Sequence, residues 1–399
     1  MGRTTFALTL TNALTWPVAQ SKRDPDAAWS KAVAAAEKQA GVRVGDEDEQ
    51  WIDDFRFLLN RVAEVPGLTP IGWISSLNDA RQRLATRLRI RELHRRHPQI
   101  GAEPIENPIF VVGLPRTATT LTHRILAASP AHRGPLRWEM AHPDLPVGPE
   151  VERARIKSAE KANVVTKWAP DFDIIHPVEA TKAEESILLL PHGLYHVLYH
   201  CPMPKYREWL AERDATADYR YLKEVLQVLQ HGRDRRRWVL KNPLDLAEMG
   251  TVRRVFPDAT FVWTHRDPIT VMGSLCSLMD LSYSLFLKSF DRAALGRLAL
   301  EVMAETVEAG RTWRQNNLEA VVDVPYHRLN AAPERYVPEL YERLGATWSE
   351  TDSEHLHEAL ARPVRDRKHE YTIRQFDLTE TEIENAFGDY NRFVFAING

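Results

Sequence analysis

The chain has 399 residues, of which 44% are hydrophobic and 27% charged, and its 52 basic and 55 acidic residues give a formal charge of −3. This length allows a large core without disulfide staples, and the balanced charge argues against a nucleic-acid coat or a strongly basic membrane-surface protein. Its two cysteines, Cys201 and Cys276, form no CxxC pair, which argues against a disulfide framework and favours a reducing, cytoplasmic location.

The segment Phe6–Ala19 invites comparison with a signal peptide or a membrane span. Thr9, Thr11, Asn12 and Thr15 interrupt it, and it is therefore too polar and too short for either. We interpret it as a docked N-terminal arm. Such an arm could also contact a partner subunit in a homo-oligomer. No other apolar run approaches about 18 residues, the lower limit for a span, and we expect no integral membrane association.

Helical patterns dominate the first hundred residues. They cover Asp26–Ala40, Asp46–Val65 and Ser76–His97, and together they predict a helical N-terminal extension over residues 1–104. The last pattern carries seven arginines, a feature of nucleic-acid binders. Leucine and isoleucine side chains fill an apolar stripe between the arginines, which favours a packed helix with a solvated charged face. We therefore expect no nucleic-acid partner.

From Asn107 the pattern changes to short buried strands that alternate with helices. The expected strands are Ile109–Val112, Arg237–Lys241, Ala259–Thr264 and Ala320–Pro325, and a helix over Thr117–Ala128 follows the first. This alternation predicts an α/β domain over residues 105–399, in which helices flank a P-loop-like parallel sheet. A mainly helical insert over residues 137–236 is placed to cover a ligand, because ligands of such folds bind at the carboxyl ends of the strands.

The first candidate site is the loop Gly113–Thr120, between the first strand and its helix. A tight turn there aims backbone N–H groups and the positive end of the helix dipole at an anion. Arg116, Thr119 and Thr120 add a positive charge and two hydroxyl donors. The loop is not a Walker A motif, because Ala118 and Thr119 stand where Gly-Lys is needed. Taken alone, it fits a phosphate cradle and an ordinary capped turn equally well.

A second candidate site follows the strand Ala259–Thr264. Asp267 and Pro268 suit the N-cap and first position of the next helix. Arg266 precedes them and Ser274 lies about two turns into that helix, so a guanidinium and a hydroxyl can converge on one anion. Taken alone, these residues fit an Arg266–Asp267 pair beside an ordinary helical Ser more readily.

Together these segments resemble the sulfotransferases that use 3′-phosphoadenosine 5′-phosphosulfate (PAPS), in particular a bacterial branch related to heparan and tyrosylprotein sulfotransferases. The resemblance covers about residues 105–395. Three motifs carry it in the expected order: Phe110–Thr120 is similar to the 5′-phosphosulfate loop, Trp238–Pro243 to the Leu-Lys-x-Pro strand end, and Arg266 with Ser274 to the 3′-phosphate motif.

The resemblance implies roles for single residues. The loop residues would hold the 5′-phosphate and the sulfuryl oxygens, Arg266 and Ser274 the 3′-phosphate, and Lys241 would stabilise charge on the leaving phosphate. A basic C-terminal stretch around Arg367 would close over the 3′-phosphate, although a solvated charge run fits it almost as well. The expected PAPS-binding residues are Arg116, Thr117, Ala118, Thr119, Thr120, Arg266, Ser274, Arg367 and Lys368.

One residue departs from the family pattern. Ala118 stands where the family usually has Gly, and Ala tolerates positive φ poorly. We therefore expect either a slightly different loop shape or a negative φ at Ala118.

Sulfuryl transfer requires a general base that deprotonates the acceptor in line with the S–O bond. Glu139 is the first choice, because Arg137–Pro143 is similar to the segment that carries the base in the tyrosylprotein and heparan relatives. A structural salt bridge is the competing interpretation of Glu139. The reserve candidates are Glu184, Glu185, His192 and His196.

His192, His196 and His200 lie four residues apart, a spacing that could suggest a metal site. No H-E-x-x-H arrangement accompanies them, and stacked, partly buried histidines are the favoured interpretation. The proposed chemistry requires no metal.

The insert supplies aromatic side chains that suit an apolar pocket, and equally a core. They are Trp168, Phe172, Tyr195, Tyr199, Tyr206 and Trp209. The favoured function is transfer of the sulfuryl group of PAPS to a hydroxyl of a small apolar or aromatic acceptor. The alternatives are a P-loop nucleotide kinase or NTPase, disfavoured by the missing lysine, and a non-catalytic adenosine 3′,5′-bisphosphate-binding protein.

Overall fold

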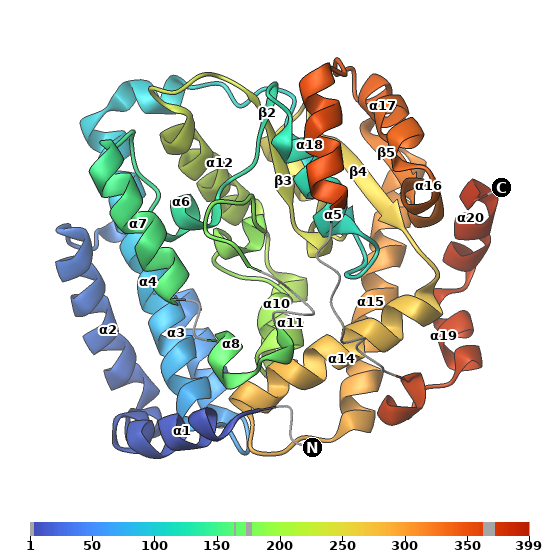
Figure 1. Cartoon of the computed structure of the whole chain (residues 1–399). Coiled ribbons are helices and arrows are strands. Elements are labelled where there is room, and N and C mark those ends of the chain that lie inside the picture. Colours follow the sequence, from blue (N-terminus) through green and yellow to red (C-terminus); the bar gives the residue numbers. More distant parts are fainter. Residues whose placement is uncertain (1–3, 163–164, 173–177, 362–371, 399) are drawn as a thin grey trace.

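A parallel β-sheet forms the centre of the protein, and its strands run in the order β2-β3-β1-β4-β5 (Figure 1). The structure is a computed structural model that describes residues 4–162, 165–172, 178–361 and 372–398. The strands are β1 (Ile109–Gly113), β2 (His132–Arg133), β3 (Arg237–Lys241), β4 (Thr260–His265) and β5 (Val321–Pro325). The predicted α/β fold with a parallel sheet is therefore confirmed.

The four predicted strands agree with the observed strands to within one residue at each end. The edge strand β2 was not predicted, because two residues are too few to show a periodic pattern. Its register places His132 opposite Arg237 and Arg133 opposite Trp238, so that β2 extends the sheet beyond β3.

Successive residues of each strand point to opposite faces of the sheet, and the two faces bury different side chains. Ile109 and Val111 of β1 pack in a cluster with α5 (Thr119–Ala128), α17 (Pro333–Arg343) and α18 (Glu350–Leu360). All five residues of β1 are buried, as expected for a central parallel strand that is covered on both faces.

The opposite face carries larger side chains and a thicker helical layer. Phe110, Trp238 and Trp263 belong to a cluster that also includes residues of α12 (Thr216–Gln230) and α15 (Arg292–Gln315). Trp238 and Trp263 are almost fully buried. This second layer forms the main core and extends to the N-terminal helices.

The N-terminal helices are α1 (Phe6–Ala19), α2 (Pro25–Ala40), α3 (Glu49–Glu64) and α4 (Pro70–Arg96), and they stand on the left and base of the molecule in Figure 1. Trp29, Phe55 and Leu84 join them to the core cluster of the sheet. The last helix begins at Pro70 rather than at the expected Ser76. Thr69 caps it by accepting a hydrogen bond from the Gly72 N–H at 3.0 Å, and Pro70 occupies its first position.

Most arginines of α4 are held by partners, and Arg83 lies inside the protein rather than on the expected solvated face. Arg83 is buried, donates to Asp79 at 2.8 Å and reaches the backbone oxygens of Leu188 at 3.2 Å and of Leu190. Arg87 pairs with Glu224 at 2.8 Å. The sequence of α4 is typical of a charged surface helix, but in the structure its arginines bind segments that are distant in sequence.

The helix α1 is the segment expected as a docked N-terminal arm. The Thr5 N–H donates to the Trp168 carbonyl at 2.8 Å, and Leu8 is buried, which docks the helix against its neighbours. Its outer face is apolar and solvent-exposed, formed by Phe6, Leu10, Leu14, Trp16 and Val18.

The expected insert over residues 137–236 is mainly helical where it is described. Its helices are α6 (Arg137–Ala141), α7 (Pro149–Ala162), α8 (Val165–Trp168), α10 (Tyr195–Tyr199), α11 (Pro204–Glu212) and α12. The remaining helices are α13 (Met249–Val255), α14 (Pro268–Phe286), α15, α16 (Tyr326–Ala331), α17, α18, α19 (Glu380–Phe387) and α20 (Asp389–Asn398).

The helix α14 corrects one expectation from the sequence. By length and composition, this helix of 19 residues is long and apolar enough to cross a bilayer. No apolar run of that length was expected from the sequence outside Phe6–Ala19. In the structure 78% of its most apolar window is buried among other elements. A helix that is hydrophobic all round is typical of a protein core as well as of a membrane span.

Gly113, the last residue of β1, generates the first prediction. It has a φ of 132°, and a Cβ atom there would lie 2.6 Å from the Thr264 carbonyl oxygen. We expect Gly113→Ala to lower the free energy of unfolding by about 2 kcal/mol or more, from backbone strain and the close contact. Urea unfolding measures this change. Gly148→Ala is the control, because its Cβ meets nothing within 4 Å, and equal stability of the two variants would contradict the prediction.

Candidate active site

The loop between β1 and α5 leaves the amino end of a helix without a side-chain cap. The helix α5 begins at Thr119, and Ala118 at its N-cap has no side-chain oxygen to accept the N–H groups of the first turn. Thr117 is fully buried and donates from Oγ1 to the Leu114 carbonyl at 2.7 Å, which closes the turn from inside. Arg116 and Thr120 are partly exposed beside it. The N–H groups and dipole of α5 are thus available to a phosphate-like group.

Ala118 adopts φ 72° and ψ 21°, the left-handed conformation. The expectation of a negative φ at this position is therefore wrong. The loop keeps the shape that a glycine would allow, and the Ala side chain bears a strain of about 1 kcal/mol or more. Arg116 also has a positive φ, 74°. Two strained residues in one short turn are characteristic of a functional loop held in place by its surroundings.

A hydrogen-bond chain joins this loop to the end of β4. Thr117 Oγ1 lies 2.6 Å from Thr264 Oγ1. The Arg116 Nε donates to Ser274 Oγ at 3.0 Å, and the Arg266 Nη1 donates to the Arg116 carbonyl at 3.1 Å. The structure therefore brings the two candidate anion sites of the sequence into direct contact.

The end of β4 is also organised as expected. Asp267 is the N-cap of α14 and accepts from the Thr270 N–H at 2.9 Å, with Pro268 at the first helical position. Asp267 therefore serves the helix, and in the described part of the chain no ion pair joins it to Arg266. The guanidinium of Arg266 lies instead over the ring of Tyr326, 4.2 Å from its centroid. Tyr326, at the start of α16, was missed because no motif marks it.

Lys241 occupies the carboxyl end of β3, and its side chain is only 1% exposed. Its Nζ donates to Glu185, in a very short ion pair, and to Thr120 Oγ1 at 3.3 Å. Burial of His123, together with the nearby charge of Lys241, lowers the pKa of His123 to about 3. The structure thus assembles a cation, a carboxylate and a hydroxyl beside the turn at the amino end of α5.

Glu185 reaches this position because the segment after it is anchored on both sides. Ser186 Oγ donates to the Lys241 carbonyl at 3.2 Å. The following short 3-10 helix, η4 (Ser186–Leu188), is held by Arg83 of α4 through the Leu188 carbonyl. Glu184, its neighbour, is buried.

Glu139 lies in a different environment. Its Oε1 accepts from Arg133 Nη2 at 2.6 Å, and its Oε2 accepts from the Leu136 N–H at 3.1 Å. Both partners of the ion pair are almost fully buried. Glu139, the first choice for the base, therefore forms a structural salt bridge, which was the competing interpretation of this residue. The carboxylate in contact with Lys241 is that of Glu185, one of the reserve candidates.

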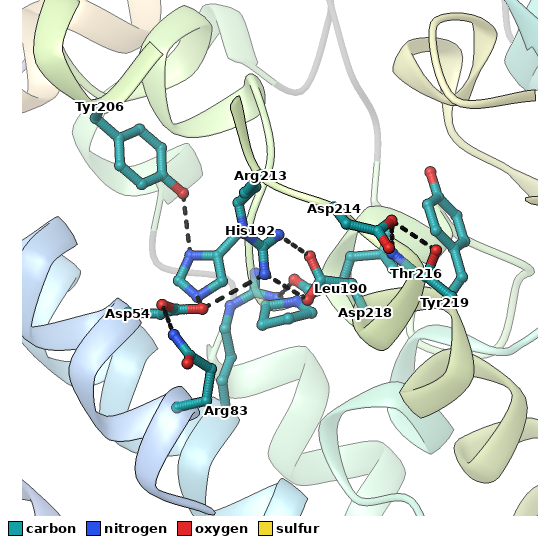
Figure 2. Close-up of polar contacts among 12 residues, drawn as sticks. Asp54, Arg83, Leu190, His192, Tyr206, Arg213, Asp214, Thr216, Asp218 and Tyr219 are labelled. Atoms are coloured by element: carbon teal, nitrogen blue, oxygen red, sulfur yellow. Dashed lines mark hydrogen bonds and ion pairs between the residues drawn. The ribbon is translucent and has the colours of Figure 1, made fainter. Parts of the chain in front are cut away.

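The three histidines of the insert are packed as expected against rings. His200 stacks on Phe286 with ring centroids 4.7 Å apart, and His196 lies 4.0 Å from Tyr195. Figure 2 shows His192 between Tyr206, 3.1 Å from its Nδ1, and Asp54. Burial lowers the pKa of all three imidazoles, which keeps them neutral near pH 7. Among the described residues no group of three or more metal-ligating side chains could hold a metal ion.

Tyr199 connects the site with an apolar cluster. Burial raises the pKa of its hydroxyl, and the charges of Glu185 and Arg116 also act on it. The cluster joins Tyr199 to Trp168, Phe172 and residues at the carboxyl end of α14. The other expected aromatic residues of the insert, Tyr195, Tyr206 and Trp209, pack in or against the main core. Arg367 and Lys368 lie outside the described residues.

Comparisons with known proteins agree on one family. Residues 108–350 match the model described as "Sulfotransferase family". The omega-hydroxy-beta-dihydromenaquinone-9 sulfotransferase Stf3 of Mycobacterium tuberculosis, and that of Mycobacterium bovis, are 27% identical over 256 residues, which cover 60% of this chain. The match spans 62% of the length of these curated relatives.

Two solved structures share the fold over most of the chain. Sulfotransferase STF9 from Mycobacterium avium has a TM-score of 0.81 and 27% identity, with coverage of 90% of this chain and 95% of its own. Sulfotransferase STF1 from Mycobacterium tuberculosis H37Rv has a TM-score of 0.77 and 27% identity, with coverage of 90% and 98%.

The buried ion pair of Glu139 generates the second prediction. We expect Glu139→Gln to lower the free energy of unfolding by about 3 kcal/mol, because Arg133 would keep its charge in a buried site without its partner. Urea unfolding measures the loss. Glu342→Gln, the same change on the surface of α17, should alter stability by less than about 0.5 kcal/mol. Equal effects of the two changes would show that the Glu139 pair contributes nothing.

Proposed function

Because the chain belongs to the sulfotransferase family, we propose that it transfers the sulfuryl group of PAPS to a hydroxyl of a small, apolar acceptor, with Glu185 as the general base. The observation that carries this proposal is the contact of buried Lys241 with both Glu185 and Thr120 at the amino end of α5. These are the groups that sulfuryl transfer needs: a base for the acceptor, a cation for the leaving group, and an anion cradle between them.

The residues of the site fit a nucleotide with phosphates at both ends. The strained turn from Arg116 to Ala118, which leaves the first-turn N–H groups of α5 without a side-chain cap, suits the 5′-phosphosulfate. Arg266 and Ser274, which reach the same turn through Arg116, suit the 3′-phosphate. We assign no role to Arg367 or Lys368 beyond the family resemblance to a stretch that covers the 3′-phosphate.

PAPS supplies the sulfuryl group. The side chains around it accept the proton of the acceptor hydroxyl and stabilise the negative charge on the leaving group. Glu185 accepts the proton of the acceptor hydroxyl while the acceptor oxygen forms its bond to sulfur. As the bond between sulfur and the 5′-phosphate oxygen breaks, Lys241 and the N–H groups of α5 stabilise the charge on that oxygen. In their ion pair Glu185 is a carboxylate, which accepts a proton, and Lys241 is an ammonium, which stabilises an anion.

An apolar alcohol is the acceptor class that the surroundings favour. Tyr199 lies within the electrostatic reach of Glu185 and belongs to the apolar cluster with Trp168 and Phe172. The relative from Mycobacterium tuberculosis is named for an omega-hydroxylated dihydromenaquinone, which is also a hydroxyl on an apolar molecule. The two cysteines are free and buried, in keeping with a reaction in the cytoplasm.

The third prediction separates the two candidate bases. We expect Glu185→Gln to lower kcat by about 10²–10⁴-fold while the affinity for adenosine 3′,5′-bisphosphate changes only a few-fold, because the amide cannot accept the proton. The assay is mass spectrometry of an apolar alcohol panel and a metabolite extract incubated with PAPS, which detects the gain of sulfate.

Glu139→Gln is the matched control. Below its unfolding transition this variant should keep the turnover per folded molecule. Loss of turnover in Glu139→Gln with normal turnover in Glu185→Gln would return the base role to Glu139. The absence of any sulfated product from the wild-type protein, despite nucleotide binding, would instead support a non-catalytic nucleotide-binding protein.

The fourth prediction concerns the 3′-phosphate. We expect Arg266→Ala to weaken the binding of adenosine 3′,5′-bisphosphate by about 1.5–3 kcal/mol, the contribution of a hydrogen bond to a charged group. Calorimetry with this nucleotide measures the change, and adenosine 5′-monophosphate, which lacks the 3′-phosphate, should lose little affinity. Thermal stabilisation by ATP with Mg²⁺ and not by the bisphosphate would reject the assignment.

A further inference from the structure

A cavity with a chemistry of its own lies close to the candidate active site. Its volume is about 370 Å³, within the usual range for small-molecule sites. It lies between α11, the start of α12, α15 and η5 (Pro243–Leu246), and Figure 2 shows part of its wall around His192, Arg213 and Asp218. Neither Lys241 nor Glu185 lines it. The exposed residues of its lining, Ala211, Ala247, Glu305 and Ala309, mark its mouth.

Most charges in the cavity wall are matched in pairs. Arg213 donates to Asp218 from both Nη1 and Nη2, and its Nη2 lies 3.0 Å from Asp218 Oδ1 (Figure 2). Arg207 pairs with Glu305 at 2.6 Å. These two arginines therefore neutralise two of the carboxylates and leave no spare positive charge for the others.

Asp245 is a buried carboxylate in this wall without a cation. It is 1% exposed, and its Oδ1 accepts from Tyr219 Oη at 2.6 Å and from Asn242 Nδ2 at 2.5 Å. Its Oδ2 has no hydrogen-bond partner among the described residues. Burial, together with the negative charges of Glu248 and Glu185, raises the pKa of Asp245 to about 7. A buried acceptor left without a partner costs about 1–3 kcal/mol, which a suitable ligand would recover.

Glu248 adds a second unmatched charge. It lines the cavity, is partly buried, and forms no ion pair with any residue that the structure describes. Above about pH 7, where Asp245 is ionised, the two residues give the cavity two negative charges that its own arginines do not balance. The occupant that this wall calls for is therefore a cation.

The remaining wall decides the kind of cation. Leu190, Leu194, Leu210 and Leu244 line it with aliphatic side chains, which suit a hydrocarbon body. Within the described ranges no cluster of three metal-ligating side chains exists, so the wall is unsuited to a bare metal ion. An alkylammonium group provides three N–H donors for a carboxylate and a carbon chain for the leucines.

We propose that this cavity binds a small aliphatic amine or diamine, whose ammonium group donates to Asp245 Oδ2 and whose carbon chain lies on the leucines. The site is separate from the nucleotide cradle, and its occupation requires no sulfuryl transfer. It nevertheless adjoins the strand end that carries the reactive cation, because Asn242, which holds Asp245, directly follows Lys241. The carboxylate of Glu185 also acts on Asp245.

The test is calorimetry of the full chain with 1,4-diaminobutane and n-pentylamine at about pH 8, where Asp245 is mainly ionised. We expect both amines to bind. 1-Pentanol, which has the same carbon chain as n-pentylamine without the charge, should bind at least about tenfold more weakly than n-pentylamine. Asp245→Asn should weaken amine binding by about tenfold or more, because it removes the charge and keeps the shape. Glu342→Gln, on the surface of α17, is the matched control and should bind as the wild type does.

Ala309→Trp keeps the proposal testable if Asp245→Asn fails to fold. Position 309 is exposed at the mouth of the cavity, so a large ring there should block amine binding without a loss of thermal stability. The proposal is overturned if no amine binds to the wild type at about 1 mM, or if binding survives both variants. It is also overturned if adenosine 3′,5′-bisphosphate displaces the amine competitively. Binding is measured without PAPS or an acceptor, so failure of the proposed function leaves this result unaffected.

Discussion

A buried ammonium group governs how the segments of this protein come together. The Nζ of Lys241 is enclosed at the end of β3, and a charge in such a place is stable only beside an opposite charge and further hydrogen-bond partners. Glu185 supplies the charge from the insert, and Thr120 supplies a hydroxyl from the amino end of α5. The same requirement that stabilises the fold therefore places a carboxylate, a cation and the uncapped amino end of α5 within one site.

The sequence predicts the parts of this arrangement that depend on local pattern. The strands, the turn after β1 and the Asp267 cap of α14 each follow from periodicity or from residue preferences over a few positions. The resemblance to sulfotransferases rested on the same short segments and is confirmed by the family match over residues 108–350.

The roles that the sequence could not predict depend on contacts between residues that are distant in sequence and adjacent only in the folded protein. Glu139 and Glu185 are both insert carboxylates, and the difference between them is that Arg133 faces one and Lys241 faces the other. Arg83 illustrates the same limit, because its helix reads as a charged surface until the carbonyl groups of η4 are placed against it. The conformation of Ala118 is also set from outside, since an Ala in isolation favours negative φ and the surrounding contacts hold it at 72°.

The hydrogen bonds from Arg116 to Ser274 and from Arg266 back to the same turn have a consequence for how the protein would recognise its ligand. Because both proposed anion positions make a hydrogen bond with Arg116, these bonds restrain the separation between them. Once one end of a doubly charged ligand is seated, the other end meets its site at an effective concentration set by the loop rather than by the solution. If the proposed donor binds here, the geometry of the turn would disfavour nucleotides that carry a charged group at only one end.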